Sequence, residues 1–379
     1  MSYKRLGDYI KRVSIKNSDG LVEILYGINI DKFFMPSVAN VIGTDLSRYK
    51  VVTKNQFACN RMHVGRDKRL PISLSLENYD FIVSPAYDVF EITDTDIISY
   101  EYLMMWFTRE EFDRNCWFHT DSDVRGKLDW DAFMDMELPI PSIAQQQQIV
   151  AEYNTVTNRI TLNNQLNQKL EETAQALYKH WFVGDTNTQI NLNEYIEFNP
   201  KYSIKKGSLT SYIEMADLQE DQLSIKGTIK RNFKSGSKFR NEDTLLARIT
   251  PCFENGKTAF VDCLNEDEIA FGSTEFIVMR AKNQTSIYWV YCLARDDNFR
   301  EHAISSMIGS DGRQRVSSDY LKEYKIAKID NSQMERFDSL ASPLFKMVKI
   351  SNKKSQTLKE LQSLLLAKMT QQETKAQAV

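Results

Sequence analysis

The stretch LPIPSIAQQQQIV, residues 138–150, marks the point where an extended segment gives way to a long helix. Pro139 and Pro141 favour extended backbone, because proline fixes its own φ and disfavours helix in the residue before it. Ser142 can accept a hydrogen bond from the first free amides of a helix, and Gln145 can reach back to Ser142. This capping box predicts that a helix begins at about residue 142.

The glutamines therefore open a helix, and we expect Gln146–Gln148 to form a solvated first turn. A degenerate copy of the stretch, IAKIDNSQMERF, lies at residues 326–337. It keeps the capping spacing with Asp330 and Gln333, which predicts a second helix beginning there. At about 1.5 Å of rise per residue, each helix would extend roughly 60 Å.

Both predicted helices, at 142–184 and 330–372, carry apolar residues at alternating spacings of four and three, as a coiled-coil seam does. Polar residues interrupt both seams at the same central positions, and an antiparallel pair would bring these positions together. We therefore predict an antiparallel coiled coil; the alternative is two amphipathic helices that each lie on their own domain. The predicted seam comprises Ile149, Val156, Ile160, Asn163, Asn167, Leu170, Leu177, Leu344, Val348, Ser351, Ser355, Leu358 and Leu365.

The two halves of the chain repeat one another. Gln333 lies 188 residues after Gln145, and with one residue of slippage Arg248 falls on Arg61. Collinear matches at nearly one offset indicate a tandem duplication, and hence an internal pseudo-two-fold repeat. Short β-branched and aromatic runs in each half, followed by one helix, predict two similar small α+β domains that the helices separate. The predicted order is a globular domain at 1–141, the helix at 142–184, a globular domain at 185–329, the helix at 330–372 and a tail at 373–379.

Composition limits the class of protein. The chain has 379 residues, of which 42% are hydrophobic and 26% charged, as in a globular protein of more than one domain. It contains neither a run of about 20 apolar residues nor the apolar core of a signal peptide, so we expect no membrane association. Its five cysteines are odd in number and unpatterned, which favours a reduced cytoplasm. The net charge of −3 weighs mildly against nucleic acid as a partner.

Basic residues nevertheless cluster in segments that read as loops. Arginine and lysine on glycine-containing loops suit phosphate contacts and the reading of guanine edges, although a charge run is more often a solvated face. For Arg61 and Arg248, which lie on expected strands, a structural ion pair is at least as good an interpretation. The candidate DNA-binding residues are Arg61, His63, Arg66, Lys68, Arg69, Arg125, Lys127, Lys230, Arg231, Lys234, Lys238, Arg240, Arg313 and Arg315.

No motif in the chain predicts catalysis. The sequences NPKY at 199–202 and SPAY at 84–87 resemble a methyltransferase loop but lack its second proline. A glycine-rich turn that could hold a nucleotide cofactor is also missing. Cysteines and histidines at 59, 63, 116 and 119 could form a zinc site, yet the second half has no counterparts, so buried thiols are the better interpretation. We predict a non-catalytic recognition protein that binds neither metal nor cofactor.

Together these features resemble the specificity (S) subunit of type I restriction-modification enzymes. The resemblance rests on the helix entry at 138–145, the helix that ends in ALYKHWF, the Gly-Arg-Gln-Arg-Val stretch at 312–316, the opening SYKRLGDYI and the half-chain duplication. It extends over essentially the whole chain. The second helix entry departs from the family pattern, because Ala327 and Ile329 replace its prolines.

The resemblance implies two target-recognition domains, each reading one half of a bipartite, asymmetric site in double-stranded DNA. It also implies that the paired helices fix the gap between half-sites and dock two methylation subunits, which bind S-adenosylmethionine and methylate an adenine that they flip out of the helix. A restriction subunit joins for cleavage. Two alternatives stay open: the recognition module of a type II-like system, or a coiled-coil scaffold that does not bind nucleic acid.

Overall fold

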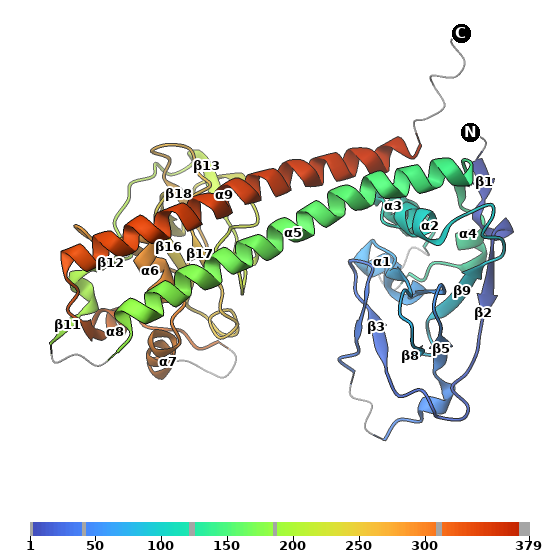
Figure 1. The fold of residues 1–379 in the computed structure, drawn as a ribbon, viewed down its shortest axis with the longest axis horizontal. Coiled ribbons are helices and arrows are strands. Elements are labelled where there is room, and N and C mark those ends of the chain that lie inside the picture. The colour runs from blue at the N-terminus through green and yellow to red at the C-terminus, as the bar shows by residue number, and fades with distance from the viewer. Residues whose placement is uncertain (1–2, 40–42, 121–125, 185–187, 308–312, 371–379) are drawn as a thin grey trace, which may run out of the picture. The chain divides into compact units, whose positions relative to one another are not determined.

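The computed structural model describes all residues except 1–2, 40–42, 121–125, 185–187, 308–312 and 371–379 (Figure 1). The chain forms two compact units, and each long helix contributes to both. Unit 1 comprises Met1–Asn158 and Leu358–Val379, and unit 2 comprises Arg159–Thr357. Each unit therefore contains one globular domain and a portion of both long helices, which differs from the consecutive segments that the sequence suggested.

Helix α5 spans Ile143–Phe182 and begins with the capping box that the sequence predicts. The amide of Gln145 donates to Oγ of Ser142 at 3.4 Å, and the amide of Ser142 donates to Oε1 of Gln145 at 3.2 Å. These two bonds satisfy amides that the start of a helix would otherwise leave without a partner.

The expectation of a solvated first turn is wrong for Gln146, which is fully buried. Its Nε2 donates to the carbonyls of Ile97 and Pro141, both at 2.8 Å. Its Oε1 accepts from the amide of Ser99 at 2.9 Å, and Ser99 caps helix α2, Tyr100–Phe107. One side chain therefore ties the start of α5 to the globular domain of unit 1.

Helix α9 spans Asn331–Lys368 and begins differently from its counterpart. The Nε2 of Gln333 donates to the carbonyl of Trp181 at 2.7 Å, and the carboxylate of Asp330 accepts from the hydroxyl of Ser332. The second copy of the capping motif therefore ties the start of α9 to the end of α5.

The polar centre of the helix pair is internally hydrogen-bonded in unit 2. Nδ2 of Asn163 donates to Oγ of Ser355 at 3.1 Å, and Nδ2 of Asn167 donates to Oδ1 of Asn352 at 2.7 Å. Asn163, Asn167, Ser351 and Ser355 are each at most 6% exposed. Partners at rising positions in α5 fall at decreasing positions in α9, so the two helices run antiparallel.

Unit 1 continues the same pairing. Nε2 of Gln362 donates to Oγ1 of Thr157 at 2.7 Å, and Leu366 and Met369 pack into the core of the first globular domain. All the seam residues that the sequence predicts are buried or half-buried. The predicted antiparallel coiled coil is confirmed. The two helices also pack on the cores of the globular domains, so the packing on a domain that the alternative interpretation expected is present as well.

The globular domains share one sheet topology, which confirms the predicted repeat. A four-stranded antiparallel sheet has the order β2-β9-β6-β7 in unit 1 and β12-β19-β16-β17 in unit 2. The counterpart strands also pair in the same way. Cys59 in β6 pairs with Asp88 in β9, and Leu246 in β16, the counterpart of Cys59, pairs with Ile277 in β19. The strands are β2 Ile10–Val13, β6 Phe57–Cys59, β7 Ile72–Leu74, β9 Asp88–Ile92, β12 Ile196–Phe198, β16 Thr244–Ala247, β17 Thr258–Phe260 and β19 Phe276–Ala281.

The remaining short elements of the two domains also correspond. An antiparallel strand pair beside the long helices, β1-β10 in unit 1 and β11-β20 in unit 2, brings the ends of each domain together. The corresponding elements are β1 Tyr3–Arg5, β10 Glu137–Pro139, β11 Gln189–Asn191, β20 Lys325–Ala327, α3 Glu110–Phe118, α4 Trp130–Met134, α6 Ile287–Ala294, α7 Asp297–Ser305 and α8 Ser318–Lys322.

Among the described helices, none is long and apolar enough to span a membrane.

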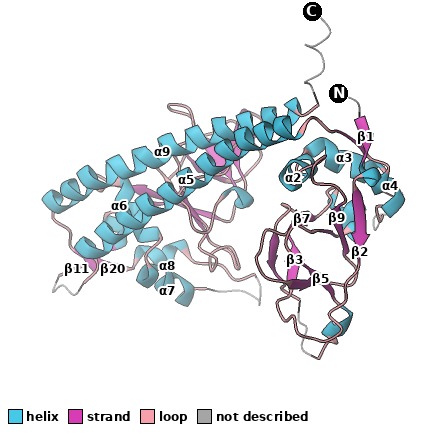
Figure 2. Ribbon diagram, turned by 45° about the vertical axis from the view of Figure 1, so that its right-hand side comes forward, coloured by secondary structure: helices cyan, strands magenta, loops and turns pink. Residues whose placement is uncertain are grey.

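The domains differ in the strands beyond the shared sheet (Figure 2). Unit 1 has two separate strand pairs, β3-β4 and β5-β8, together with the short helix α1, Val64–Asp67. Unit 2 instead has a second four-stranded sheet, β14-β13-β18-β15, in which β13 and β18 are parallel. The strands are β3 Tyr26–Ile28, β4 Phe34–Pro36, β5 Lys50–Val52, β8 Phe81–Val83, β13 Leu209–Ile213, β14 Ile229–Asn232, β15 Ser237–Phe239 and β18 Ala270–Gly272.

Candidate nucleic-acid interface

Arg61 is a structural residue in unit 1. Only 5% exposed, it donates from Nε to Oδ2 of Asp88 at 2.5 Å and from Nη1 to the carbonyl of Leu128. Arg12 also pairs with Asp88, and both guanidinium groups lie over the ring of Trp130. The structure therefore favours the structural ion pair over a DNA contact for Arg61, because burial and a carboxylate partner already engage its guanidinium group.

Asp88 should carry a large share of the stability of unit 1. We expect Asp88→Ala to lower the free energy of unfolding by about 3–5 kcal/mol, because it leaves the buried guanidinium of Arg61 without a counter-charge. Arg66→Ala is the control: its pair with Asp67 is exposed, so the loss should stay below about 1 kcal/mol. Urea denaturation of both variants measures the difference, and equal losses would contradict the assignment.

The other candidates in unit 1 that the structure describes remain at least partly exposed. Arg69 pairs with Asp31 at 2.8 Å, and the ammonium of Lys68 lies 4.6 Å from the centre of the Trp117 ring. Lys127 is exposed. The side chain of His63 and the whole of Arg125 lie outside the described part of the chain.

In unit 2, strand β14 presents two of the candidates, and each has an acidic partner. Lys230 pairs with Glu268 at 2.7 Å, and Arg231 pairs with Glu214 at 2.9 Å. Burial disfavours the charged form of Glu268, but hydrogen bonds from Lys230 and Ser211 outweigh it and lower the pKa of Glu268 to about 2. Lys230 therefore faces a carboxylate that stays ionised at neutral pH.

The remaining candidates of unit 2 differ in whether their charged groups already have a partner within the chain. Lys234, Arg240 and Arg313 are exposed. Arg315 donates from Nε and Nη2 to the carboxylate of Glu275, at 2.8 to 3.1 Å. A fork-to-fork pair of this kind is strong and geometrically specific, which makes Arg315 a less available DNA contact than its neighbours.

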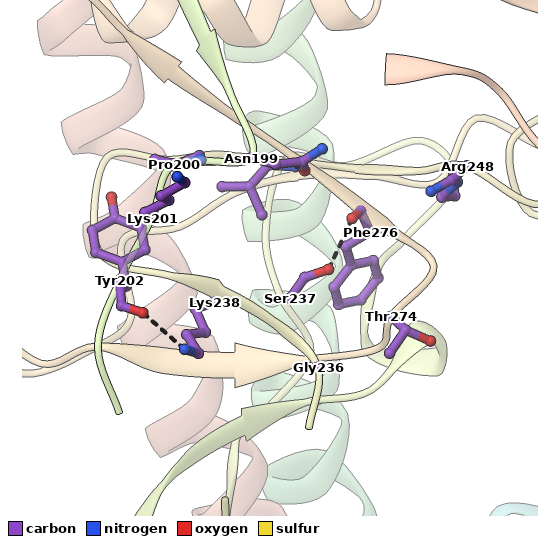
Figure 3. Close-up of a pocket in the computed structure, with 11 residues that line it drawn as sticks. Asn199, Pro200, Lys201, Tyr202, Gly236, Ser237, Lys238, Arg248, Thr274 and Phe276 are labelled. Atoms are coloured by element: carbon purple, nitrogen blue, oxygen red, sulfur yellow. Dashed lines mark hydrogen bonds between the residues drawn. The ribbon is translucent and has the colours of Figure 1, made fainter. Parts of the chain in front are cut away.

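Unit 2 also contains a pocket of about 460 Å³ (Figure 3). Its walls include the loop Asn199–Tyr202, the segment Gly236–Lys238 and the residues Arg248 and Thr274. Lys238 is the only sequence-predicted candidate among the lining residues. Sequence reasoning missed Lys201, which belongs to the NPKY motif, and assigned Arg248 no DNA contact.

The walls of this pocket are fixed by hydrogen bonds. Oδ2 of Asp243 accepts from the hydroxyl of Tyr202 at 3.2 Å, and its Oδ1 accepts from Nε of Arg280 at 2.7 Å. Burial raises the pKa of Asp243, although hydrogen bonds from Arg280 and the Arg240 amide oppose this. Nζ of Lys238 donates to the carbonyl of Tyr202 at 2.8 Å. The NPKY loop is therefore held by the sheet that it covers.

A glycine allows two strands of the pocket wall to approach closely. Gly236 has φ of 141°, a region that side chains rarely adopt, and a Cβ built on it would lie 2.1 Å from the carbonyl oxygen of Gly272. Any other residue at position 236 would therefore push β15 away from β18.

The structure gives no support to the zinc alternative. Cys59 and Cys116 are buried free thiols, and burial raises the pKa of both. Among the described residues, no group of three histidine, cysteine, aspartate or glutamate side chains is arranged to hold a metal ion.

Three curated proteins are similar to parts of the chain, while no family model matches it. The HindI specificity subunit of a type I restriction enzyme from Haemophilus influenzae is 28% identical over 157 residues, covering 40% of this chain and 33% of the relative. The EcoEI specificity subunit from Escherichia coli is 25% identical over 164 residues, covering 41% and 27%. The EcoAI specificity subunit from the same species is 39% identical over 85 residues, covering 22% and 14%. The chain thus spans about a third or less of these relatives.

A solved structure supports the fold over a greater length. The crystal structure of a type I restriction-modification S subunit from M. genitalium matches 97% of this chain and 95% of its own chain. Its TM-score is 0.54 and its sequence identity 12%, so the likeness is one of fold. The chain thus resembles type I restriction enzyme specificity subunits in part of its sequence, and it has the fold of one over nearly its whole length.

Proposed function

We propose that this chain is the DNA-recognition subunit of a type I restriction-modification complex and reads a bipartite, asymmetric site. The observation that carries the proposal is the duplicated domain: two copies of one sheet topology are joined by an antiparallel helix pair. Two similar readers on one chain suit a target with two separate halves, and the helix pair suits a spacer of set length. The partial sequence similarity to specificity subunits supports the same function.

In this proposal the chain is non-catalytic and binds no cofactor. Two methylation subunits supply S-adenosylmethionine and transfer the methyl group to adenine, and a restriction subunit supplies cleavage. We place the complex in the cytoplasm, where the five free cysteines would stay reduced.

The helix pair has a surface that suits the docking of partner subunits. Leu340, Met347 and Ile350 of α9 are 47%, 47% and 56% exposed. They are spaced by seven and three residues, so they form a second apolar stripe beside the seam. Exposed apolar stripes of this kind are typical of binding surfaces, and we assign this one to a methylation subunit.

Mapping methylated adenines in the source genome tests the proposed function. We expect a split motif with a constant gap, and deletion of this reading frame should abolish methylation of that motif alone. A scaffold that does not bind nucleic acid predicts an unchanged methylation map. A type II-like module predicts that no separate methylation subunit copurifies with the chain.

The net charge of −3 leads to a second prediction. If partner subunits supply much of the phosphate neutralisation, the isolated chain should bind a duplex more weakly than the assembled complex, and with a shallower salt dependence. Each phosphate contact contributes a slope of about −0.9 in log K against log salt. Titrating both on one duplex measures this, and equally steep slopes would show that the chain neutralises the phosphates alone.

A further inference from the structure

The pocket of unit 2 is lined by cations without a carboxylate among its lining residues (Figure 3). Lys201, Lys238 and Arg248 all contribute to its walls, and Figure 3 draws Arg248 on the side opposite Lys201. Lys201 and Thr274 are exposed, so the pocket opens to solvent. This charge pattern is that of an anion site, in a domain where three of the other candidate cations, Lys230, Arg231 and Arg315, already have acidic partners.

Arg248 is the unusual member of this set. Its Nε is buried and has no hydrogen-bond partner within the described part of the chain. Buried polar groups in folded proteins are nearly always hydrogen-bonded, and an unpaired guanidinium donor is costly. Arg109 and Arg300 also have a buried guanidinium nitrogen without a partner among the described residues, but neither lines this pocket. The unpaired donor of Arg248 points to an external anion because it coincides with an open, cation-lined pocket.

The duplicated domain shows why Arg248 lacks a partner. In unit 1 the equivalent Arg61 pairs with Asp88, which lies opposite Cys59 in the sheet. In unit 2 the position opposite Leu246, the counterpart of Cys59, is occupied by Ile277. The carboxylate of the first domain is thus replaced by an apolar side chain, and the guanidinium of the second domain is left available.

The nearest carboxylate along the neighbouring strand does not fill this role. The amide of Arg248 donates to the carbonyl oxygen of Glu275 at 2.9 Å, but the carboxylate of Glu275 binds Arg315 through both of its oxygens. Unit 2 therefore pairs a different arginine with its carboxylate and leaves Arg248 at the pocket.

The pocket is also preorganised. Asn199 has φ of 52°, and its Oδ1 accepts from the amide of Val278 at 3.0 Å, which fixes the start of the NPKY loop. Lys238 uses one of its three ammonium donors on the carbonyl of Tyr202, and its ammonium also lies 5.2 Å from the centre of the Phe233 ring. Because these groups are already held in place, an anion could bind at little cost in side-chain entropy.

We propose that this pocket binds one backbone phosphate of the DNA target, with Arg248 as its principal ligand and Lys201 and Lys238 as supporting cations. The inference rests on the proposed function and names a contact within it. A phosphate of the DNA backbone fits better than a free nucleotide, since neither aromatic ring of the lining offers a free face for base stacking. The ring of Phe276 is only 2% exposed, and the guanidinium of Arg280 lies over the ring of Tyr202, 5.2 Å from its centre. Unit 1 lacks this contact, because Asp88 neutralises Arg61.

The test uses the full chain assembled with its methylation subunits. A labelled duplex that carries the mapped methylation motif, and a scrambled duplex, are titrated by fluorescence anisotropy at several salt concentrations. We expect Arg248→Ala to weaken binding of both duplexes by the same factor, about 3–10-fold, and to reduce the salt slope by about 1. Lys226→Ala, which removes an exposed lysine outside the pocket lining, is the matched control and should leave the slope unchanged.

Each outcome decides between explanations. The urea midpoint of Arg248→Ala should be no lower than that of the wild type, because the substitution removes a buried donor that has no hydrogen-bond partner among the described residues. Unchanged affinity for both duplexes would overturn the phosphate site, and so would loss of binding to the motif duplex alone, which indicates a base contact. If ADP or inorganic phosphate stabilises the wild type but not the variant, and DNA affinity is the same for both, the pocket serves a free anion and the proposal fails. If the wild-type complex binds neither duplex, the proposed function itself fails.

Discussion

A heptad inserted into both long helices should lengthen the gap in the recognised DNA motif and leave both half-sites intact. The insertion points are between Asn158 and Arg159 in α5 and between Thr357 and Leu358 in α9, where the two units meet in the chain. Seven residues restore the seam, because the apolar pattern repeats every seven residues. They add about 10 Å of helix, or roughly three base pairs at about 3.4 Å each.

Methylation mapping in cells that carry the variant measures the result. We expect methylation of the original motif to fall below detection, while the motif with the longer gap becomes methylated. An insertion in α5 alone is the control, since it shifts the register that joins Thr157 to Gln362 relative to the register that joins Asn163 to Ser355, and it should abolish activity. A folded double insertion that methylates the original motif would show that the helix pair does not set the gap.

Exchange of the first globular domain should change one half-site only. If residues 1–141 come from another specificity subunit, we expect a new first half-site, with the gap and the second half-site unchanged. The whole strand pair β1-β10 lies within the exchanged segment, so the junction before Ser142 does not divide it. A change in both half-sites, or in neither, would contradict the assignment of one reader to each domain.

The structure also indicates how this exchange can fail for another reason. Gln146 lies beyond the junction, yet its side chain bonds to Ile97, Ser99 and Pro141 within the exchanged segment. Exchanging the whole of unit 1, residues 1–158 together with 358–379, keeps these contacts native to the donor. This larger exchange should give the same new half-site with a higher unfolding midpoint than the smaller one. A matching motif from both chimeras separates recognition from stability.

Local sequence determined most of the architecture of this protein. The capping box at Ser142 and Gln145 placed the start of α5, because those bonds form between residues three apart. The apolar spacing identified the paired helices, and the polar positions in the middle of each seam indicated that they run antiparallel. The repeat predicted the shared domain, since duplicated sequence conserves both the periodicity of the elements and their order.

Only the tertiary structure decided which of these side chains are available for binding. Gln146 looked like a solvated residue, yet it is buried because a helix and a loop about 47 residues earlier in the chain supply its partners. Arg61 and Arg248 occupy the same position in the two copies, but strand register places Asp88 beside one and Ile277 in the matching position of the other. Helical periodicity is a property of neighbouring residues, whereas the partner of a buried charge is set by strands distant in the chain. The sequence therefore predicted the scaffold, and the folded sheet determined which arginine has a carboxylate partner and which does not.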